Sequence, residues 1–174
     1  SGHHPPQLPT DYPMRLSLES FVMRKVAIWG YGQEGQAAHR FLRTMFPEKK
    51  IGIILSPEEA ARWDFSDDPL VEVVAEELRA GSFGPYQIVI KSPGISPYRH
   101  ERAMEWAHFR GTRFISGTSL WFSQHARDKT VVITGTKGKS TTSALVARLL
   151  RASGARTALA GNIGLPLIEL MDPD

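Results

Sequence analysis

The sequence predicts an α/β fold built on a parallel β-sheet. Short apolar runs alternate along the chain with longer stretches whose apolar residues recur at helical spacing, which is typical of strand–helix–strand units. Glycine-rich segments directly follow two of the apolar runs, where a strand would turn into a helix. The 174 residues suffice for one good core or about one and a half domains.

The first part of the chain contains most of the expected elements. The apolar runs predict strands at 26–29, 51–55, 71–73, 87–90 and 112–115. Helical spacing predicts helices at 36–45, from about 57, in a turn through 78, at 99–110 and at 119–126. The segment 92–97 holds two prolines and a glycine, which continue neither a strand nor a helix, so we expect a fixed loop there.

A second unit is expected after a polar hinge at 127–129. Its predicted elements are a strand at 131–133, a helix at 139–153, a strand at 157–160, a loop at 161–164 and a helix from 165 to 171. A single unit of this kind cannot bury both faces of its sheet. We therefore expect a disordered or tag-like segment 1–20, a first domain 21–117, a connector 118–128 and the truncated start of a second domain, 129–174.

Composition and charge exclude several classes of function. The formal net charge is only +3 and the arginines are scattered, so nucleic acid is not an expected partner. The absence of cysteine excludes disulfides, cysteine-based zinc sites and a cysteine nucleophile. No apolar run reaches the length of a membrane span, so no membrane insertion is expected. His39, His100, His108 and His125 lie in predicted helices without the spacing of metal ligands.

A GxGxxG motif lies between the first predicted strand and helix. It consists of Gly30, Tyr31, Gly32, Gln33, Glu34 and Gly35, and this position favours a dinucleotide or diphosphate site. An NAD site also needs an acidic residue at the end of the next strand, where this chain has Leu55 and Ser56. Glycines kept only for tight helix–strand packing are another interpretation. We favour a nucleotide diphosphate other than NAD.

The loop that follows the strand at 87–90 begins with Ser92, Pro93 and Gly94. Ligands of open α/β sheets bind beyond the carboxyl ends of the strands. We therefore expect this loop and the glycine motif to face one crevice, although the tripeptide alone could be a plain turn.

A phosphate-binding loop is predicted before the helix at 139–153. Its residues are Gly135, Thr136, Lys137, Gly138, Lys139, Ser140 and Thr141. Backbone N–H groups of such a loop bind phosphate, the lysine at the helix start reaches the outer phosphates, and a neighbouring hydroxyl ligates Mg²⁺. The spacing between the first glycine and the Gly-Lys pair is shorter than usual.

A fourth motif, at 161–164, contains two glycines and Asn162. The Asn162 amide could contact a ligand, and a simple turn is the alternative interpretation of this segment.

Taken together, these four motifs and their order resemble the Mur ligase family of bacterial cell-wall synthesis, from about residue 24 to the end. Within it, the chain resembles the type that adds glutamate to UDP-N-acetylmuramoyl-L-alanine. Lys137 and the segment 91–98 favour the branch that uses L-glutamate over the one that uses D-glutamate. The resemblance implies a Rossmann-like domain that binds the UDP-sugar, followed by the start of a P-loop ATPase-type domain.

The resemblance also implies the chemistry. ATP would phosphorylate the substrate carboxylate with the help of Mg²⁺, and glutamate would attack the acyl phosphate. Lys139 would be catalytic, residues 135–141 would bind ATP, and Ser140 or Thr141 would ligate Mg²⁺. The UDP-sugar would contact residues 30–35, Ser56, Ser92 to Gly94 and Asn162. A cytoplasmic monomer in bacteria is implied, and this incomplete portion is expected to be inactive alone because later family residues lie beyond it.

Two alternatives remain at this stage. A Rossmann-type module that senses nucleotides without catalysis would bind NAD(H) or ATP in the first domain. Another ATP-dependent glutamate ligase, such as a folylpolyglutamate synthase, would share the phosphate loop. Such enzymes begin with that loop, however, and residues 24–117 would then have no counterpart.

Overall fold

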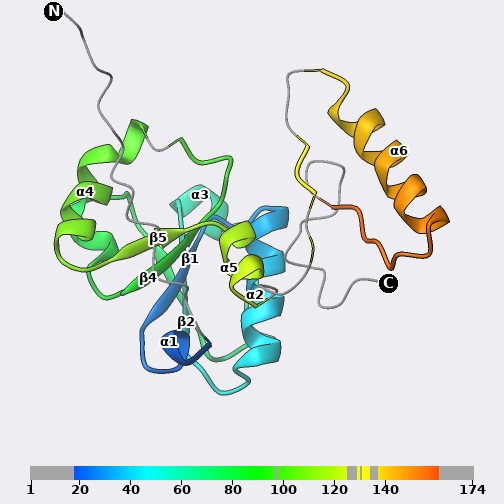
Figure 1. Ribbon diagram of the computed structural model, residues 1–174. Helices are drawn as coiled ribbons and strands as arrows, with labels where there is room; N and C mark the ends of the chain where they lie inside the picture. The colour runs from blue at the N-terminus through cyan, green and yellow to red at the C-terminus, as the bar shows by residue number, and fades with distance from the viewer. Residues whose placement is uncertain (1–17, 97, 125–128, 130, 134–136, 161–174) are drawn as a thin grey trace, which may run out of the picture.

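A five-stranded parallel sheet forms the centre of the computed structural model (Figure 1), which describes residues 18–96, 98–124, 129, 131–133 and 137–160. The strand order is β3-β2-β1-β4-β5, and every neighbouring pair is parallel. The strands are β1 (Val26–Trp29), β2 (Ile51–Leu55), β3 (Val71–Ala75), β4 (Ile88–Lys91) and β5 (Arg113–Ile115). The predicted α/β class and the five predicted strands of the first unit are therefore confirmed.

Apart from the first helix, which was not predicted, the helices also lie close to their predicted positions. They are α1 (Leu18–Val22), α2 (Gln33–Met45), α3 (Pro57–Ala60), α4 (Glu101–Phe109), α5 (Gly117–Gln124) and α6 (Lys139–Ala152), with 3₁₀ turns η1 (Ala80–Phe83) and η2 (Tyr98–His100). No helix among the described residues combines the length and apolarity needed to cross a bilayer.

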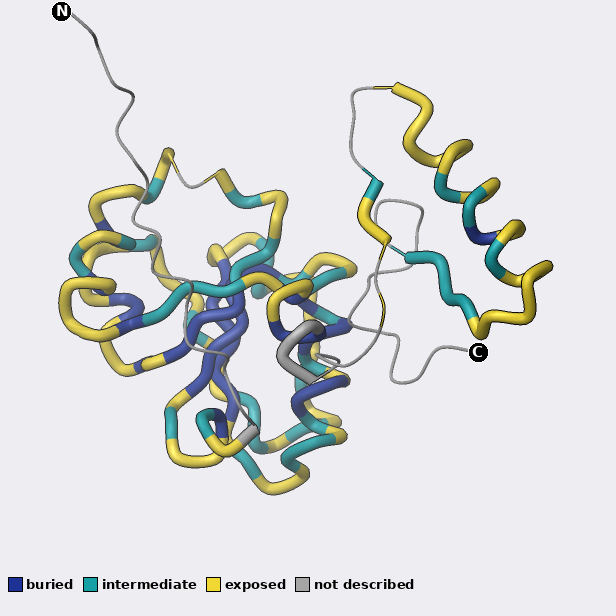
Figure 2. Tube along the Cα trace, viewed as in Figure 1, coloured by how far each residue is buried: buried dark blue, intermediate teal, exposed yellow. Residues whose placement is uncertain are grey.

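The core has two layers because β1 and β4 are apolar on both faces, as parallel strands covered on both sides must be. Val26 and Ile28 of β1 face a cluster that includes residues of α1, α2 and α5. Ala27 and Trp29 alternate to the other face and pack in a cluster with residues of η1 and α4. Figure 2 shows the buried strands as a dark centre between these two layers.

Four predictions of secondary structure need correction. Residues 131–133 and 157–160, which were predicted to be strands of the second unit, carry no regular structure, and Val131 and Val132 are 63% and 72% exposed. A strand needs a hydrogen-bonding neighbour, and neither segment has one among the described residues. The turn predicted through Leu78 starts later, at Ala80, and residues 18–20, assigned to a disordered segment, belong to α1.

The anchor of α1 explains this last difference. Phe21 is fully buried in the cluster with α2 and α5, so burial of one aromatic ring holds a five-residue helix whose sequence shows no period. The predicted helix at 139–153 is confirmed by α6. The predicted loop around Asn162, the helix at 165–171, Gly135 and Thr136 lie outside the described residues.

Candidate functional site

The strand order reverses at β1, and this reversal positions the site. The chain runs outward from β1 through β2 to β3, then returns to place β4 on the other side of β1. At such a point the connections that follow the two central strands leave in opposite directions and open a crevice at the carboxyl edge of the sheet. The glycine motif follows β1 and the Ser92 loop follows β4, so both predicted loops begin at this edge.

Gly30 and Ser92 lie close together across the reversal point, so the two loops that were predicted to face one crevice are neighbours. The N–H of Gly30 donates to the Ile54 carbonyl at 3.0 Å, and the N–H of Ser92 donates to the Trp29 carbonyl at 3.0 Å. A Cβ on Gly30 would lie 2.7 Å from Ser92 Oγ and 3.0 Å from Ile95 Cδ1. Gly30 also has a φ of +91°, which side chains rarely adopt. This glycine is therefore needed by the fold itself.

The other two motif glycines differ sharply in their surroundings. A Cβ on Gly35 would overlap the carbonyl oxygen of Gly30 and lie 3.0 Å from its carbonyl carbon, so Gly35 is needed for packing of α2 against the loop. A Cβ on Gly32 would meet no atom within 4 Å, and its φ of −72° suits any residue. Packing therefore explains Gly30 and Gly35 but gives no reason for glycine at position 32.

The open space at Gly32 lies at the start of α2. Gly32 is the N-cap of α2, and no side chain caps this helix. Glycine has no side chain that could cap the helix, and the start of a helix is a suitable place for an anion. A Cβ added to Gly94 in the second loop would likewise meet no atom within 4 Å.

Ser92 supplies a buried polar atom without a partner. Its Oγ is shielded from solvent and makes no hydrogen bond within the described part of the chain, a condition that is uncommon because burial of an unpaired hydroxyl costs free energy. Pro93, next to it, is exposed. Ser56, the third predicted contact, accepts a hydrogen bond from the Glu59 N–H at 3.2 Å and caps α3, so its side chain already has a structural role.

Tyr31 is fixed by a chain of hydrogen bonds that the sequence did not reveal. Its hydroxyl lies 2.7 Å from His39 Nδ1, and His39 Nε2 lies 2.7 Å from Asp68 Oδ2. Because a carboxylate only accepts, Nε2 carries a proton, and in the neutral ring Nδ1 then accepts from Tyr31. Arg43 Nε donates to the same Asp68 oxygen at 2.7 Å. The network ties the glycine loop to α2 and to the segment before β3.

Charge and burial act together in this network. Burial alone would raise the pKa of the Asp68 carboxyl, but hydrogen bonds from Arg43 and His39 outweigh it, so its pKa is lowered. Burial is also the main reason that the pKa of Tyr31 is raised, and the hydroxyl stays protonated as a donor. His39 and Asp68 lie 29 positions apart, so no local spacing could have indicated their contact.

Glu34 is the motif residue least suited to an anionic ligand. It lies in the first turn of α2 and is half-buried, and burial raises the pKa of its carboxyl. An ionised carboxylate there would repel a phosphate. If position 34 contacts such a ligand, the backbone N–H is the suitable group.

The described part of the phosphate loop has the geometry of a helix start. Gly138 is the N-cap of α6 with a φ of +75°, a left-handed conformation that favours glycine. Lys137, Lys139, Ser140 and Thr141 are all exposed, and no side chain caps α6. Backbone N–H groups and a lysine are thus presented together, as phosphate binding requires.

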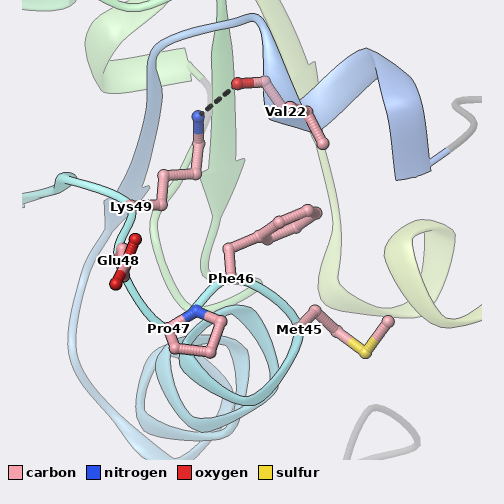
Figure 3. A pocket seen from close by; sticks show the side chains of 6 residues that line it. All are labelled: Val22, Met45, Phe46, Pro47, Glu48 and Lys49. Atoms are coloured by element: carbon pink, nitrogen blue, oxygen red, sulfur yellow. Dashed lines mark hydrogen bonds between the residues drawn. The ribbon is translucent and has the colours of Figure 1, made fainter.

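The cavity drawn in Figure 3 lies elsewhere. It measures about 470 Å³ and is lined by Val22, Met45, Phe46, Pro47, Glu48 and Lys49, none of which was predicted as a site residue. Lys49 Nζ donates to the Val22 carbonyl at 3.3 Å, and burial lowers the pKa of this lysine. The cavity adjoins the carboxyl end of α2, away from the helix start. Among the described residues no group of His, Asp or Glu could hold a metal ion.

Comparison with known proteins points to one kind of enzyme. No protein-family model matches the chain. A protein of Xanthomonas euvesicatoria pv. vesicatoria named UDP-N-acetylmuramoyl-L-alanine–L-glutamate ligase is 48% identical over 92% of this chain and 34% of its own length. A protein of the same name from Xylella fastidiosa is 46% identical over 86% of this chain and 32% of its own length. Another from a Micromonospora species is 37% identical over 91% of this chain and 35% of its own length. The chain spans about a third of the length of these relatives. It is a homologue of the N-terminal part of UDP-N-acetylmuramoyl-L-alanine–L-glutamate ligases.

Proposed function

We propose that this chain binds the UDP-sugar substrate, and begins the ATP site, of a ligase that adds L-glutamate to UDP-N-acetylmuramoyl-L-alanine during peptidoglycan synthesis. The carboxyl ends of β1 and β4 carry the proposal, because Gly32 at the start of α2 and Gly94 after β4 both have open space around them. The names of the relatives support the substrate and the L-enantiomer of glutamate. A monomer in the bacterial cytoplasm is part of the proposal.

In this reaction ATP transfers its γ-phosphate to the substrate carboxylate, and the glutamate amine displaces phosphate from the acyl phosphate to form the amide. This chain would contribute binding and orientation: the start of α2 and the loop at 92–94 hold the UDP part, while Asn162 contacts the substrate or the reacting phosphate. The end of β2 has Leu55, which is buried, and Ser56 where an NAD site needs an acidic residue, which argues against NAD at the same strand ends.

The start of α6 would hold the ATP phosphates through residues 135–141. Lys139 neutralises charge on the outer phosphates without forming a covalent bond, as phosphoryl transfer requires. The hydroxyls of Ser140 and Thr141 are oxygen donors that suit Mg²⁺, and both residues are exposed at the helix start. The nearby Ser143 hydroxyl instead donates to the Lys139 carbonyl at 2.7 Å and so has a structural partner. Mg²⁺ would there offset phosphate charge.

Isothermal titration calorimetry of the 174-residue chain tests the first half of this proposal. We expect binding of UDP-N-acetylmuramoyl-L-alanine and no heat from NADH. The reverse pattern, NADH binding without the UDP-sugar, would indicate a nucleotide-sensing module and would contradict the ligase assignment of the crevice.

A further inference from the structure

The connection between β1 and α2 consists of three residues, Gly30, Tyr31 and Gly32. Its two ends are held by the fold: Gly30 packs against the Ser92 loop, and the Gly32 carbonyl accepts a helical hydrogen bond from the Gln36 N–H at 2.9 Å. Glycine restricts its own backbone least of all residues, so the peptide groups on either side of Tyr31 can rotate unless Tyr31 itself is fixed. The contacts of this one residue therefore decide how rigid the connection is.

Tyr31 is fixed by residues from outside the connection. Its hydroxyl lies 2.7 Å from His39 Nδ1, and the Gln36 side-chain amide donates to its carbonyl at 3.2 Å. Its ring meets the rings of Trp63 and Phe65 edge-on, with 4.8 and 4.9 Å between centroids. Such aromatic contacts add to the stabilisation that burial provides. The connection is thus held through a single tyrosine, from α2 and from the segment between α3 and β3.

His39 can hold Tyr31 in place because its own ring is fixed from the other side. His39 Nε2 lies 2.7 Å from Asp68 Oδ2, which also accepts from Arg43 Nε at 2.7 Å. Arg43 Nη1 donates in turn to the Lys49 carbonyl at 2.7 Å. With both ring nitrogens engaged, the imidazole cannot turn without breaking a hydrogen bond. The position of the Tyr31 hydroxyl is therefore set by the end of α2 and the segment before β3.

The packing of the core does not require this arrangement. Gly30 and Gly35 already allow the connection and α2 to pack closely. Tyr31 and His39 are only half-buried, and one hydrogen bond contributes modestly to stability. The arrangement instead fixes the backbone directly before Gly32, at the start of α2, where the proposed function places a phosphate. A site whose backbone is ordered before the ligand arrives binds more tightly, because binding then loses less entropy.

Resting on the function proposed above, we propose that His39 is a positioning residue: through Tyr31 it keeps the connection between β1 and α2 in one conformation, ready for the UDP-sugar. His39 does not touch the ligand in this role. Without the Tyr31–His39 hydrogen bond, the ligand has to order the connection itself, so affinity falls by no more than that bond contributes. For a single hydrogen bond this limit is about tenfold.

Calorimetry with UDP-N-acetylmuramoyl-L-alanine tests the positioning role on the 174-residue chain. Tyr31→Phe removes the hydroxyl, and His39→Gln keeps a donor for Asp68 but places no atom at the Nδ1 position. We expect each variant to weaken binding about three- to tenfold, and the double variant to weaken it no further, because both changes remove the same hydrogen bond. His39→Asn places an acceptor near the Nδ1 position and should restore most of the affinity.

Tyr86→Phe is the matched control. It removes another tyrosine hydroxyl, one that lies beside Gly52 near the amino end of β2 and so away from the carboxyl edge of the sheet. We expect its affinity to equal that of the wild type. Thermal unfolding shows whether each variant is folded. Tyr31→Phe and His39→Gln proteins that lose thermal stability but bind as the wild type does would reduce the network to a structural role and overturn the proposal, as would losses that add in the double variant.

A second measurement does not depend on the ligand. The backbone order parameters of the Gly32 and Gln33 amides, from nuclear magnetic relaxation, should be about 0.85 in the wild-type chain and lower in Tyr31→Phe. If the UDP-sugar binds and Tyr31→Phe changes neither affinity nor order parameters, only the positioning role fails. If the wild-type chain binds no UDP-sugar, the proposed function fails. The order parameters then decide whether His39 positions the connection: a fall in Tyr31→Phe supports it, and no change overturns it.

Discussion

Alanine at Gly35 should reduce the stability of the fold, whereas alanine at Gly32 should reduce the affinity for the ligand. In Gly35→Ala, the new methyl group would overlap the Gly30 carbonyl, a backbone group that cannot rotate away. Overpacking costs about 1–3 kcal/mol, and rigid backbone places this case near the upper end. Alanine recovers about 1 kcal/mol through its helix propensity. We therefore expect Gly35→Ala to lower the free energy of unfolding by about 2 kcal/mol.

Gly32→Ala should leave stability nearly unchanged. No atom lies within 4 Å of the added methyl group, and the backbone angles suit alanine. Alanine is a poorer N-cap than glycine, so a loss of roughly 0.5 kcal/mol is expected. If the ligand approaches this backbone closely, however, the methyl group occupies its space, and UDP-sugar affinity should fall at least about tenfold.

Urea unfolding and calorimetry on the two variants give the decisive comparison. A Gly35→Ala protein as stable as wild type would show that the loop and α2 adjust freely, and the packing argument would be refuted. A Gly32→Ala protein with unchanged ligand affinity would show that no ligand approaches this backbone. Because each variant is the control for the other, general damage to the fold cannot imitate the expected pattern.

The remaining predictions concern the core, the charges and the ATP half. Gly52→Ala should destabilise by at least about 2 kcal/mol in urea unfolding, because a methyl group there overlaps the Tyr86 ring. The lowered pKa of Asp68 means that its stabilisation is present above its ordinary pKa of 3.8 and is lost as pH falls through the lower folded value; Asp68→Asn should remove this part of the acid sensitivity of unfolding. The pKa of Glu34 is raised instead, so its ionised form destabilises the fold at neutral pH. Glu34→Gln should therefore slightly raise the melting temperature at pH 7 and leave it unchanged below pH 4. In a full-length protein containing this segment, Lys139→Ala should abolish ATP-dependent phosphate release and spare UDP-sugar binding; joint loss would contradict the division between the two sites.

The sequence predicted the first sheet well because its central strands β1, β2 and β4 are almost wholly buried and therefore apolar. An apolar run such as 51–55 has few alternatives when flanked by polar residues, and glycines mark where such runs end. The same reasoning failed at 131–133, since an apolar run predicts a strand only if a neighbour exists to pair with it. Whether a neighbour exists is a property of the fold and is not encoded in the run.

The candidate site was also only partly predictable from the sequence. The glycine motif and the Ser92 loop were predictable because both follow strands, and strand order then brings Gly30 against Ser92. The hydrogen-bond network of Tyr31, His39 and Asp68 was not predictable, because His39 and Asp68 lie 29 positions apart in the sequence. The motifs thus predict which strand ends carry a candidate binding loop, whereas contacts between residues far apart in the sequence become visible only in the folded chain.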